Sequence, residues 1–140
     1  MSTVQDQVIR IGIVNFLNAT PLIEGVQTVY GIELVPKVPS DLIGCLERSE
    51  VDIALASSID YQRSSADLGI LPVGVLSSDG DSYTVQLCSR IPFNDVKKVH
   101  CDSDSHTSVA LLQIILKNRY GISPEIVPID IRSMKQCDTN

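Results

Sequence analysis

The stretch RIGIVNFLNATPL, residues 10–22, decides the fold class. Its first half is an apolar strand pattern rich in Ile and Val, and its second half carries the amides Asn15 and Asn18. Pro21 follows, and proline is tolerated in the first turn of a helix. A buried strand that leads into a helix is the building unit of α/β proteins, which bind ligands at the carboxyl ends of their strands. Asn15 and Asn18 are therefore candidate ligand-binding groups.

The same alternation of strand and helix continues along the chain. Segments rich in Ile, Val and Leu without strict alternation predict strands that are covered on both faces. The order βαβαβ followed by a fresh βαβ predicts an α/β fold with mostly parallel strands. Strands are expected at residues 8–14, 32–38, 51–56, 68–76, 84–88, 98–101 and 125–129.

Two later helices have clear boundaries. The first, at about residues 41–49, is expected to have Ser40 as its N-cap and Asp41 in its first turn. The second, at about residues 107–120, is expected to end at Gly121, because glycine suits a helix C-terminus. The residues expected to face the core are Leu42, Ile43, Cys45 and Leu46 in the first helix, and Val109, Leu112, Leu116 and Tyr120 in the second.

Composition narrows the class of protein. The chain has 140 residues, 44% of them apolar and 20% charged, which is typical of a folded globular domain. The net charge of −6 opposes nucleic acid binding, because phosphates need a basic surface. The N-terminus does not have the pattern of a secretory signal, and the sequence holds no apolar run of membrane-spanning length. We therefore expect a cytoplasmic protein without a membrane or nucleic acid partner.

Metal and covalent chemistry are disfavoured. The four cysteines are far apart and do not stand at zinc-ligand spacing from either histidine, so reduced, packed thiols are expected. The motifs of serine hydrolases, P-loop enzymes, dinucleotide-binding enzymes and zinc proteases are not found in the sequence. The cysteines are Cys45, Cys88, Cys101 and Cys137.

Three clusters place small polar side chains where a strand ends and a helix begins. They are Asn15 with Asn18, Ser57 with Ser58, and the run Ser105-His106-Thr107-Ser108. The N-terminus of a helix offers N–H groups and a partial positive charge that can hold a carboxylate. Alternatively, the hydroxyls of Ser57, Ser58, Thr107 and Ser108 only cap helices, and the two amides only satisfy the backbone of a turn.

Five segments in order resemble the chorismate dehydratase family, which acts in menaquinone biosynthesis by the futalosine pathway. The similarity begins near Arg10 and covers nearly all of the chain beyond it. The segments are RIGIVNFLNATPL (10–22), VPSDL (38–42), VDIALASSIDY (51–61), SSDGDSYTVQLCSR (77–90) and HTSVALLQIILKNRYG (106–121).

The resemblance implies a fold similar to type II periplasmic binding proteins, in which two α/β lobes enclose a cleft. Residues 1–89 would form most of lobe 1, and residues 90–140 the hinge and the start of lobe 2. Members of the family are about twice as long. The chain thus resembles their amino-terminal half, and we expect it to be truncated.

The resemblance also implies a carbon–oxygen lyase that removes water from chorismate to give 3-[(1-carboxyvinyl)oxy]benzoate, without cofactor or metal. Asn18 matches a family asparagine and is the catalytic candidate. The expected substrate-binding residues are Asn15, Ser58, Thr84, Ser105, His106, Thr107 and Ser108.

This sequence departs from the family pattern at some of these positions. His106 stands where an arginine is common, Ser57 replaces a proline, and Asp81 adds negative charge. The sequence identifies neither the general base nor the oligomeric state. The alternative function is a binding or sensor module, without catalysis, for a small aromatic carboxylate.

Overall fold

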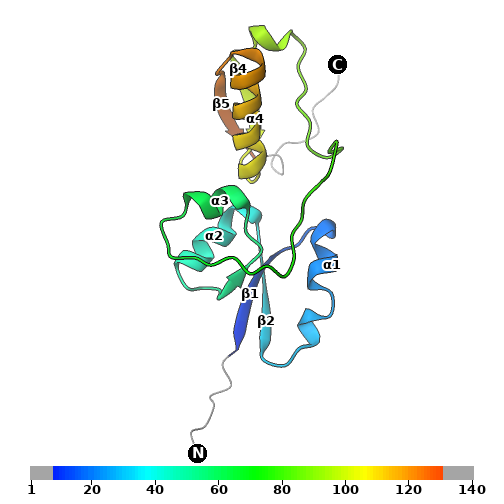
Figure 1. The fold of residues 1–140 in the computed structure, drawn as a ribbon, viewed down its shortest axis with the longest axis vertical. Helices are drawn as coiled ribbons and strands as arrows, with labels where there is room; N and C mark the ends of the chain where they lie inside the picture. The colour runs from blue at the N-terminus through cyan, green and yellow to red at the C-terminus, as the bar shows by residue number, and fades with distance from the viewer. Residues whose placement is uncertain (1–7, 131–140) are drawn as a thin grey trace, which may run out of the picture. The chain divides into compact units, whose positions relative to one another are not determined.

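The computed structural model describes residues 8–130, which divide into two compact units (Figure 1). Unit 1 extends to Asp79 and unit 2 begins at Gly80. Each unit combines parallel strands with helices, which confirms the predicted α/β architecture. The assignment of residues 1–89 and 90–140 to two lobes stays a prediction.

Unit 1 contains a three-stranded parallel sheet in the order β2-β1-β3. In the register of this sheet Val14 pairs with Lys37, and Gly12 pairs with both Val35 and Ala54. All three strands therefore run the same way, and their carboxyl ends lie at one edge. The strands are β1 (Ile9–Val14), β2 (Ile32–Lys37) and β3 (Ile53–Ala54), and the helices are η1 (Leu17–Ala19), α1 (Thr20–Ile23), η2 (Val26–Thr28), α2 (Pro39–Glu47) and α3 (Ser58–Arg63).

Helix α2 packs on this sheet and contributes its two buried residues, Leu42 and Cys45, to the core. Leu42 and Cys45 are fully buried, as predicted, and Leu42 packs with Val14 and Ala19. The prediction of Ser40 as N-cap is wrong, because the helix begins two residues earlier than expected, at Pro39. The fixed φ of proline suits the first helical position, so the cap falls on the residue before it.

Gly12 allows α2 to approach β1 closely. A Cβ atom at this position would lie 2.7 Å from Leu42 Cδ2, 3.3 Å from Val51 Cγ2 and 3.4 Å from the Cβ of Ala54. Leu42 and Val51 are buried, so neither side chain has open space into which to move. Gly12→Ala is therefore expected to reduce the free energy of unfolding by about 1–3 kcal/mol through overpacking. Urea unfolding followed by circular dichroism measures this loss, and an unchanged midpoint would contradict it.

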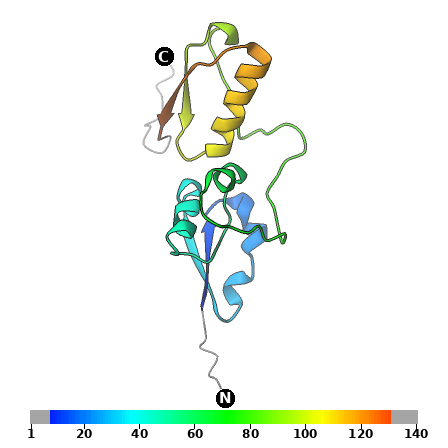
Figure 2. The same cartoon turned by 60° about the vertical axis from the view of Figure 1, so that its left-hand side comes forward.

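Unit 2 is a smaller βαβ arrangement (Figure 2). Strands β4 (Lys98–Asp102) and β5 (Glu125–Ile129) are parallel, and α4 (His106–Tyr120) connects them; η3 (Phe93–Asp95) precedes β4. Leu116 of α4 is fully buried with Val99 and Cys101. The predicted inward stripe of α4 packs on this core, and Gly121 ends the helix with a φ of 67°. Both predictions for this helix are confirmed.

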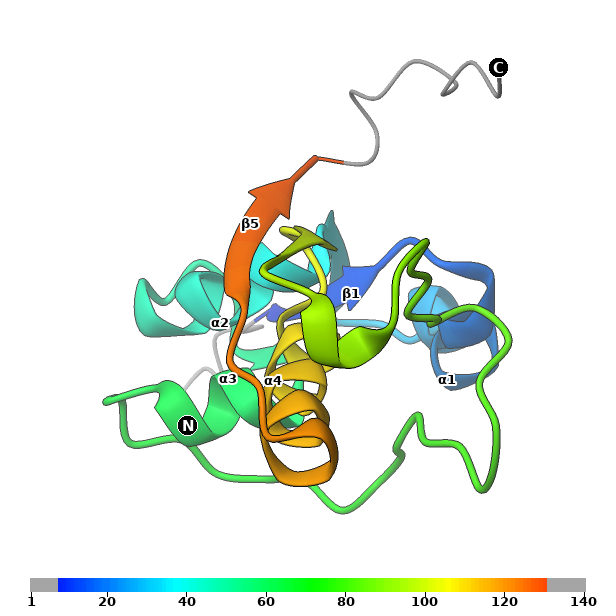
Figure 3. The ribbon, with the colours of Figure 1, turned by 90° about the horizontal axis from the view of Figure 1, so that it is seen from above.

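Two predicted strands do not form. Residues 68–76 and 84–88 contain neither helix nor strand, and the chain between α3 and η3 is irregular (Figure 3). A strand requires a partner for its backbone hydrogen bonds, and apolar composition alone does not supply one. Gly69, Pro72 and Gly74 also interrupt the first segment, and such residues weaken strands. The strand expected at 51–56 is shorter, since β3 holds only Ile53–Ala54.

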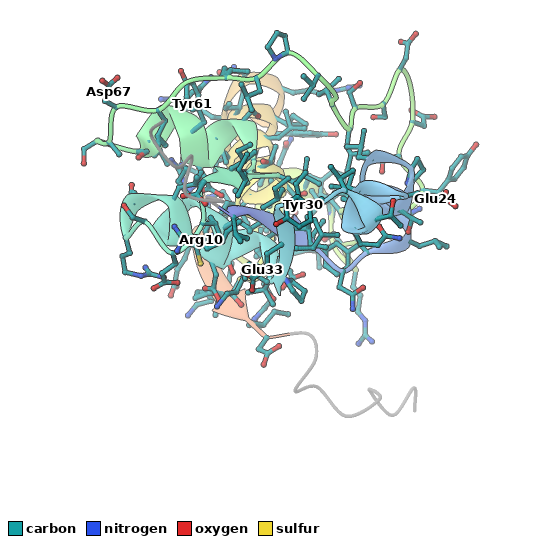
Figure 4. The ribbon with its side chains drawn as sticks, turned by 90° about the horizontal axis from the view of Figure 1, so that it is seen from below. Arg10, Glu24, Tyr30, Glu33, Tyr61 and Asp67 are labelled. Atoms are coloured by element: carbon teal, nitrogen blue, oxygen red, sulfur yellow. The ribbon has the colours of Figure 1, made fainter. Side chains whose placement is uncertain are left out.

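An ion pair extends the short contact between β1 and β3. Arg10 donates from Nη2 to Asp52 Oδ1 at 2.9 Å and from Nε to Oδ2 at 3.1 Å, and its backbone N–H also donates to Oδ2. These hydrogen bonds hold the pKa of Asp52 below its usual value. Arg10 also pairs in register with Glu33 of β2 (Figure 4). The charges of Arg10 and Asp52 thus fix the amino edge of the sheet, opposite to the edge where the strands end.

A second ion pair, between Arg48 and Glu50, is expected to make the free energy of unfolding sensitive to acid. Arg48 Nε donates to Glu50 Oε1 at 2.7 Å, which lowers the pKa of Glu50 from 4.5 to about 2. A carboxylate whose pKa falls on folding stabilises the fold above the pKa of the unfolded chain. This contribution is complete above pH 4.5 and is lost as the pH falls toward about 2.

Glu50→Gln is therefore expected to flatten the fall in stability over this pH range. Urea midpoints measured at several pH values test this, with Glu24→Gln as the control at an exposed glutamate for which no ion pair is seen among the described residues. The effect is expected to be small, because both side chains of the Arg48–Glu50 pair are largely exposed. Equal slopes for Glu50→Gln and the unsubstituted chain would contradict the prediction.

Candidate functional site

The carboxyl edge of the sheet in unit 1 brings two of the predicted clusters together. Asn15 follows β1 directly, and Ser57 lies three residues after the end of β3. Because β1 and β3 are parallel neighbours, the chain leaves both strands at the same edge. This edge is the location that open α/β sheets use for ligands.

The two amides at this edge are exposed and are not used by the fold. Asn18 lies in η1, inside the turn that closes through a hydrogen bond from Ala19 N–H to Phe16 O, at 2.9 Å. Within the described part of the chain, neither the Asn15 nor the Asn18 side chain takes part in a hydrogen bond. The alternative that these amides only satisfy the turn backbone is therefore not supported, and both amides face solvent.

Ser57 caps helix α3. This agrees with the alternative interpretation, in which the serine and threonine hydroxyls serve as helix caps. Its Oγ accepts from the backbone N–H of Asp60 at 3.2 Å and donates to Asp60 Oδ2 at 2.7 Å. Ser57 and Asp60 thus stand at the N-cap and N3 positions of a capping box, and the second printed hydrogen bond joins their side chains. Ser58 is the first residue of the helix, and its side chain is exposed. Asp60 was missed by the sequence reasoning, although the spacing S-x-x-D before a helix is a known signal.

Unit 2 gathers the predicted hydroxyls at the start of α4. Ser105 holds the N-cap position, so the alternative of Thr107 or Ser108 as the cap is wrong. The Ser105 hydroxyl donates to Ser108 Oγ at 2.7 Å and makes no side-chain capping hydrogen bond to the helix. Ser105 reaches this position because its N–H donates to the carbonyl of Asp102, which closes a tight turn after β4.

The other predicted residues of unit 2 are His106 and Thr107, in the first turn of α4, and Thr84, which lies outside that helix. His106 begins α4 and is half-buried, whereas Thr107 is exposed in the first turn. Thr84 lies in the irregular segment before β4 and is exposed, with Oγ1 3.5 Å from Ser82 Oγ. The predicted set is thus divided: Asn15, Asn18 and Ser58 belong to unit 1, and Thr84 and residues 105–108 belong to unit 2.

A cation at the edge of unit 1 was also missed by the sequence reasoning. Lys37 ends β2 and pairs in register with Val14, directly before Asn15. Its side chain is exposed. Its position near the end of the strand expected at residues 32–38 could have identified Lys37 as a candidate. Lys37 gives the edge a positive charge that the three clusters themselves do not contain.

The described residues hold no group of three His, Cys, Asp or Glu side chains arranged to bind a metal ion. Cys45 and Cys101 are buried free thiols, and burial raises the pKa of each; Cys88 is free and exposed. Cys137 lies outside the described residues. Between residues 8 and 130, every helix is too short or too polar to cross a bilayer.

The structure is that of an α/β protein with parallel strands, the class that places ligands at the carboxyl ends of its strands. A family model described as menaquinone biosynthesis matches residues 9–139, and the chain belongs to this family. The chain is also 31% identical over 107 residues to the chorismate dehydratase of Thermus thermophilus. That match covers 76% of this chain and 39% of the relative, so the chain spans about two fifths of the relative's length.

Proposed function

We propose that this chain carries part or all of a chorismate dehydratase, a lyase that removes water from chorismate to give 3-[(1-carboxyvinyl)oxy]benzoate. Family membership and the curated relative support the proposal. The structural observation that carries it is the pair of exposed amides, Asn15 and Asn18, which the fold does not use. Beside them, Ser58 stands at the same edge of the sheet.

The chemistry requires groups that stabilise developing negative charge. The proton that leaves sits on a ring carbon vinylogous to the ring carboxylate, so the charge spreads into that carboxylate. Hydrogen-bond donors aimed at the carboxylate therefore lower the barrier. We assign Asn18 to the departing hydroxyl or to this charge, and Ser58 to a substrate carboxylate. Loss of the hydroxyl gives an aromatic ring, which makes the step favourable.

The start of α4 is the proposed second carboxylate site. A helix of 15 residues has N–H groups and a partial positive charge at its N-terminus. Ser105, His106, Thr107 and Ser108 add polar side chains there, and the Ser105 hydroxyl donates to Ser108 Oγ. We assign Thr84 to the wall of the same site. Chorismate carries two carboxylates, and we assign one of them to the start of α4.

Few groups can accept the proton that leaves the ring carbon. An amide is a poor base near neutral pH, which excludes Asn15 and Asn18 from this role. Two ionisable side chains are candidates, His106 and Asp104, which directly precedes the Ser105–Ser108 run. A carboxylate of the substrate is the third candidate. The proposed reaction removes a ring proton and the ring hydroxyl as water, so it needs no redox cofactor, and the family resemblance implies no metal.

The proposed fold is the two-lobed arrangement of type II periplasmic binding proteins. Residues 1–89 would form most of the first lobe, and residues from about 90 the hinge and the second lobe. In proteins of that fold the ligand binds in a cleft between the lobes. We also propose that the protein acts in the cytoplasm, in keeping with a role in menaquinone biosynthesis.

Incubation of the purified chain with chorismate tests the proposed function. Product mass and aromatic absorbance are followed against a reaction without protein. A product of chorismate mass minus one water supports the dehydratase. Calorimetric binding of chorismate without turnover would instead favour the alternative, a binding or sensor module, and would contradict catalysis by this chain.

A further inference from the structure

Asp60 is the one buried charged side chain among residues 8–130, with 7% of its surface exposed. A buried carboxylate is costly unless hydrogen bonds satisfy it. Its Oδ2 accepts from the Ser57 hydroxyl at 2.7 Å, and its backbone N–H donates to the same hydroxyl at 3.2 Å. The two residues therefore hold each other in one conformation.

The hydrogen bonds between Ser57 and Asp60 cap the short helix α3. Helix α3 has six residues, far fewer than an isolated helix needs to be stable in water. Its first turn therefore depends on its cap and its packing. Ser57 is extended, with φ −75° and ψ 147°, and it leads the chain from the end of β3 into Ser58. The orientation of Ser58 at the carboxyl edge follows from the Ser57–Asp60 contact.

We infer that Ser57 and Asp60 are positioning residues that hold Ser58 in place to bind a substrate carboxylate. This inference rests on the proposed function. A simple cap requires only the Ser57 hydroxyl, whereas here a buried carboxylate also fixes the direction of that hydroxyl.

The test compares Ser57→Ala and Asp60→Asn with two matched variants. Ser57→Thr keeps the hydroxyl and is expected to retain binding. Ser64→Ala removes a contact at the other end of α3, where Ser64 Oγ donates to Glu47 Oε1 at 2.6 Å. Ser57→Ala is expected to raise KM for chorismate by about fivefold to tenfold. We expect kcat to change less than about twofold, since the pair does not touch the reacting atoms. Asp60→Asn is expected to raise KM in the same direction.

The Ser64→Ala control distinguishes an effect on the position of Ser58 from an effect on the stability of α3. A purely structural role predicts that Ser57→Ala and Ser64→Ala lower the thermal midpoint alike and leave KM unchanged, and this result would overturn the inference. If the unsubstituted chain binds chorismate without turnover, the same comparison is made with the dissociation constant. If it binds no chorismate, the proposed function fails, and the inference fails with it.

Discussion

Asn18→Ala is expected to lower kcat/KM for chorismate by about 10²–10³-fold while leaving the fold intact. The side chain lies in the turn after β1, faces solvent and forms no hydrogen bond with another described residue. Its removal therefore costs the fold little, whereas under the proposed function the transition state loses a hydrogen-bond donor. Steady-state kinetics measures the loss, and circular dichroism checks the fold.

Asn118→Ala is the matched control for this substitution. Asn118 is an exposed amide in the last turn of α4, at the opposite end of the helix from the predicted site residues 105–108. Its removal is expected to leave kcat/KM unchanged. Full activity in Asn18→Ala would exclude Asn18 as a catalytic group, and equal losses in both variants would show that the effect is not specific to the site.

Leu42→Ala is expected to reduce the free energy of unfolding of unit 1 by about 2–5 kcal/mol. Leu42 is fully buried in α2 and contacts the core residues Val14 and Ala19. The substitution removes apolar contact and leaves a cavity beneath the helix. Urea unfolding followed by circular dichroism measures the change.

Leu17→Ala makes the same chemical change at a position that is 89% exposed. It is expected to alter the free energy of unfolding by no more than about 0.5 kcal/mol. If both variants lose the same stability, α2 does not anchor the core of unit 1. The contrast depends on burial alone, because the residue type is identical.

Local sequence was sufficient to predict the helices and strands that have a clear apolar pattern or a clear boundary residue. The strand before Asn15 and the long helix that ends at Gly121 were predicted from their apolar patterns, and both are confirmed. Three of the later strands were also placed closely, since β2, β4 and β5 lie at the predicted positions. Asn15 and Ser57 follow two neighbouring strands, β1 and β3, whose parallel pairing agrees with the predicted parallel sheet.

Features that need a distant partner were not predictable in this way. Residues 68–76 have strand composition but no strand partner in the structure, so they remain irregular. Arg10 and Asp52 are 42 residues apart, and only the folded sheet brings them together. Whether Asn15 and Asn18 satisfy a turn or face solvent also depends on the three-dimensional path of the chain.

The sequence by itself determined the α/β class, the main helices and strands, and the family. Those conclusions follow from periodicity and from ordered motifs, which are local properties of the chain. Only the tertiary structure showed that Asp60 is buried against Ser57 and that Lys37 lies at the edge beside Asn15. Burial and neighbourhood depend on how segments far apart in the chain pack together, and no local pattern contains that information.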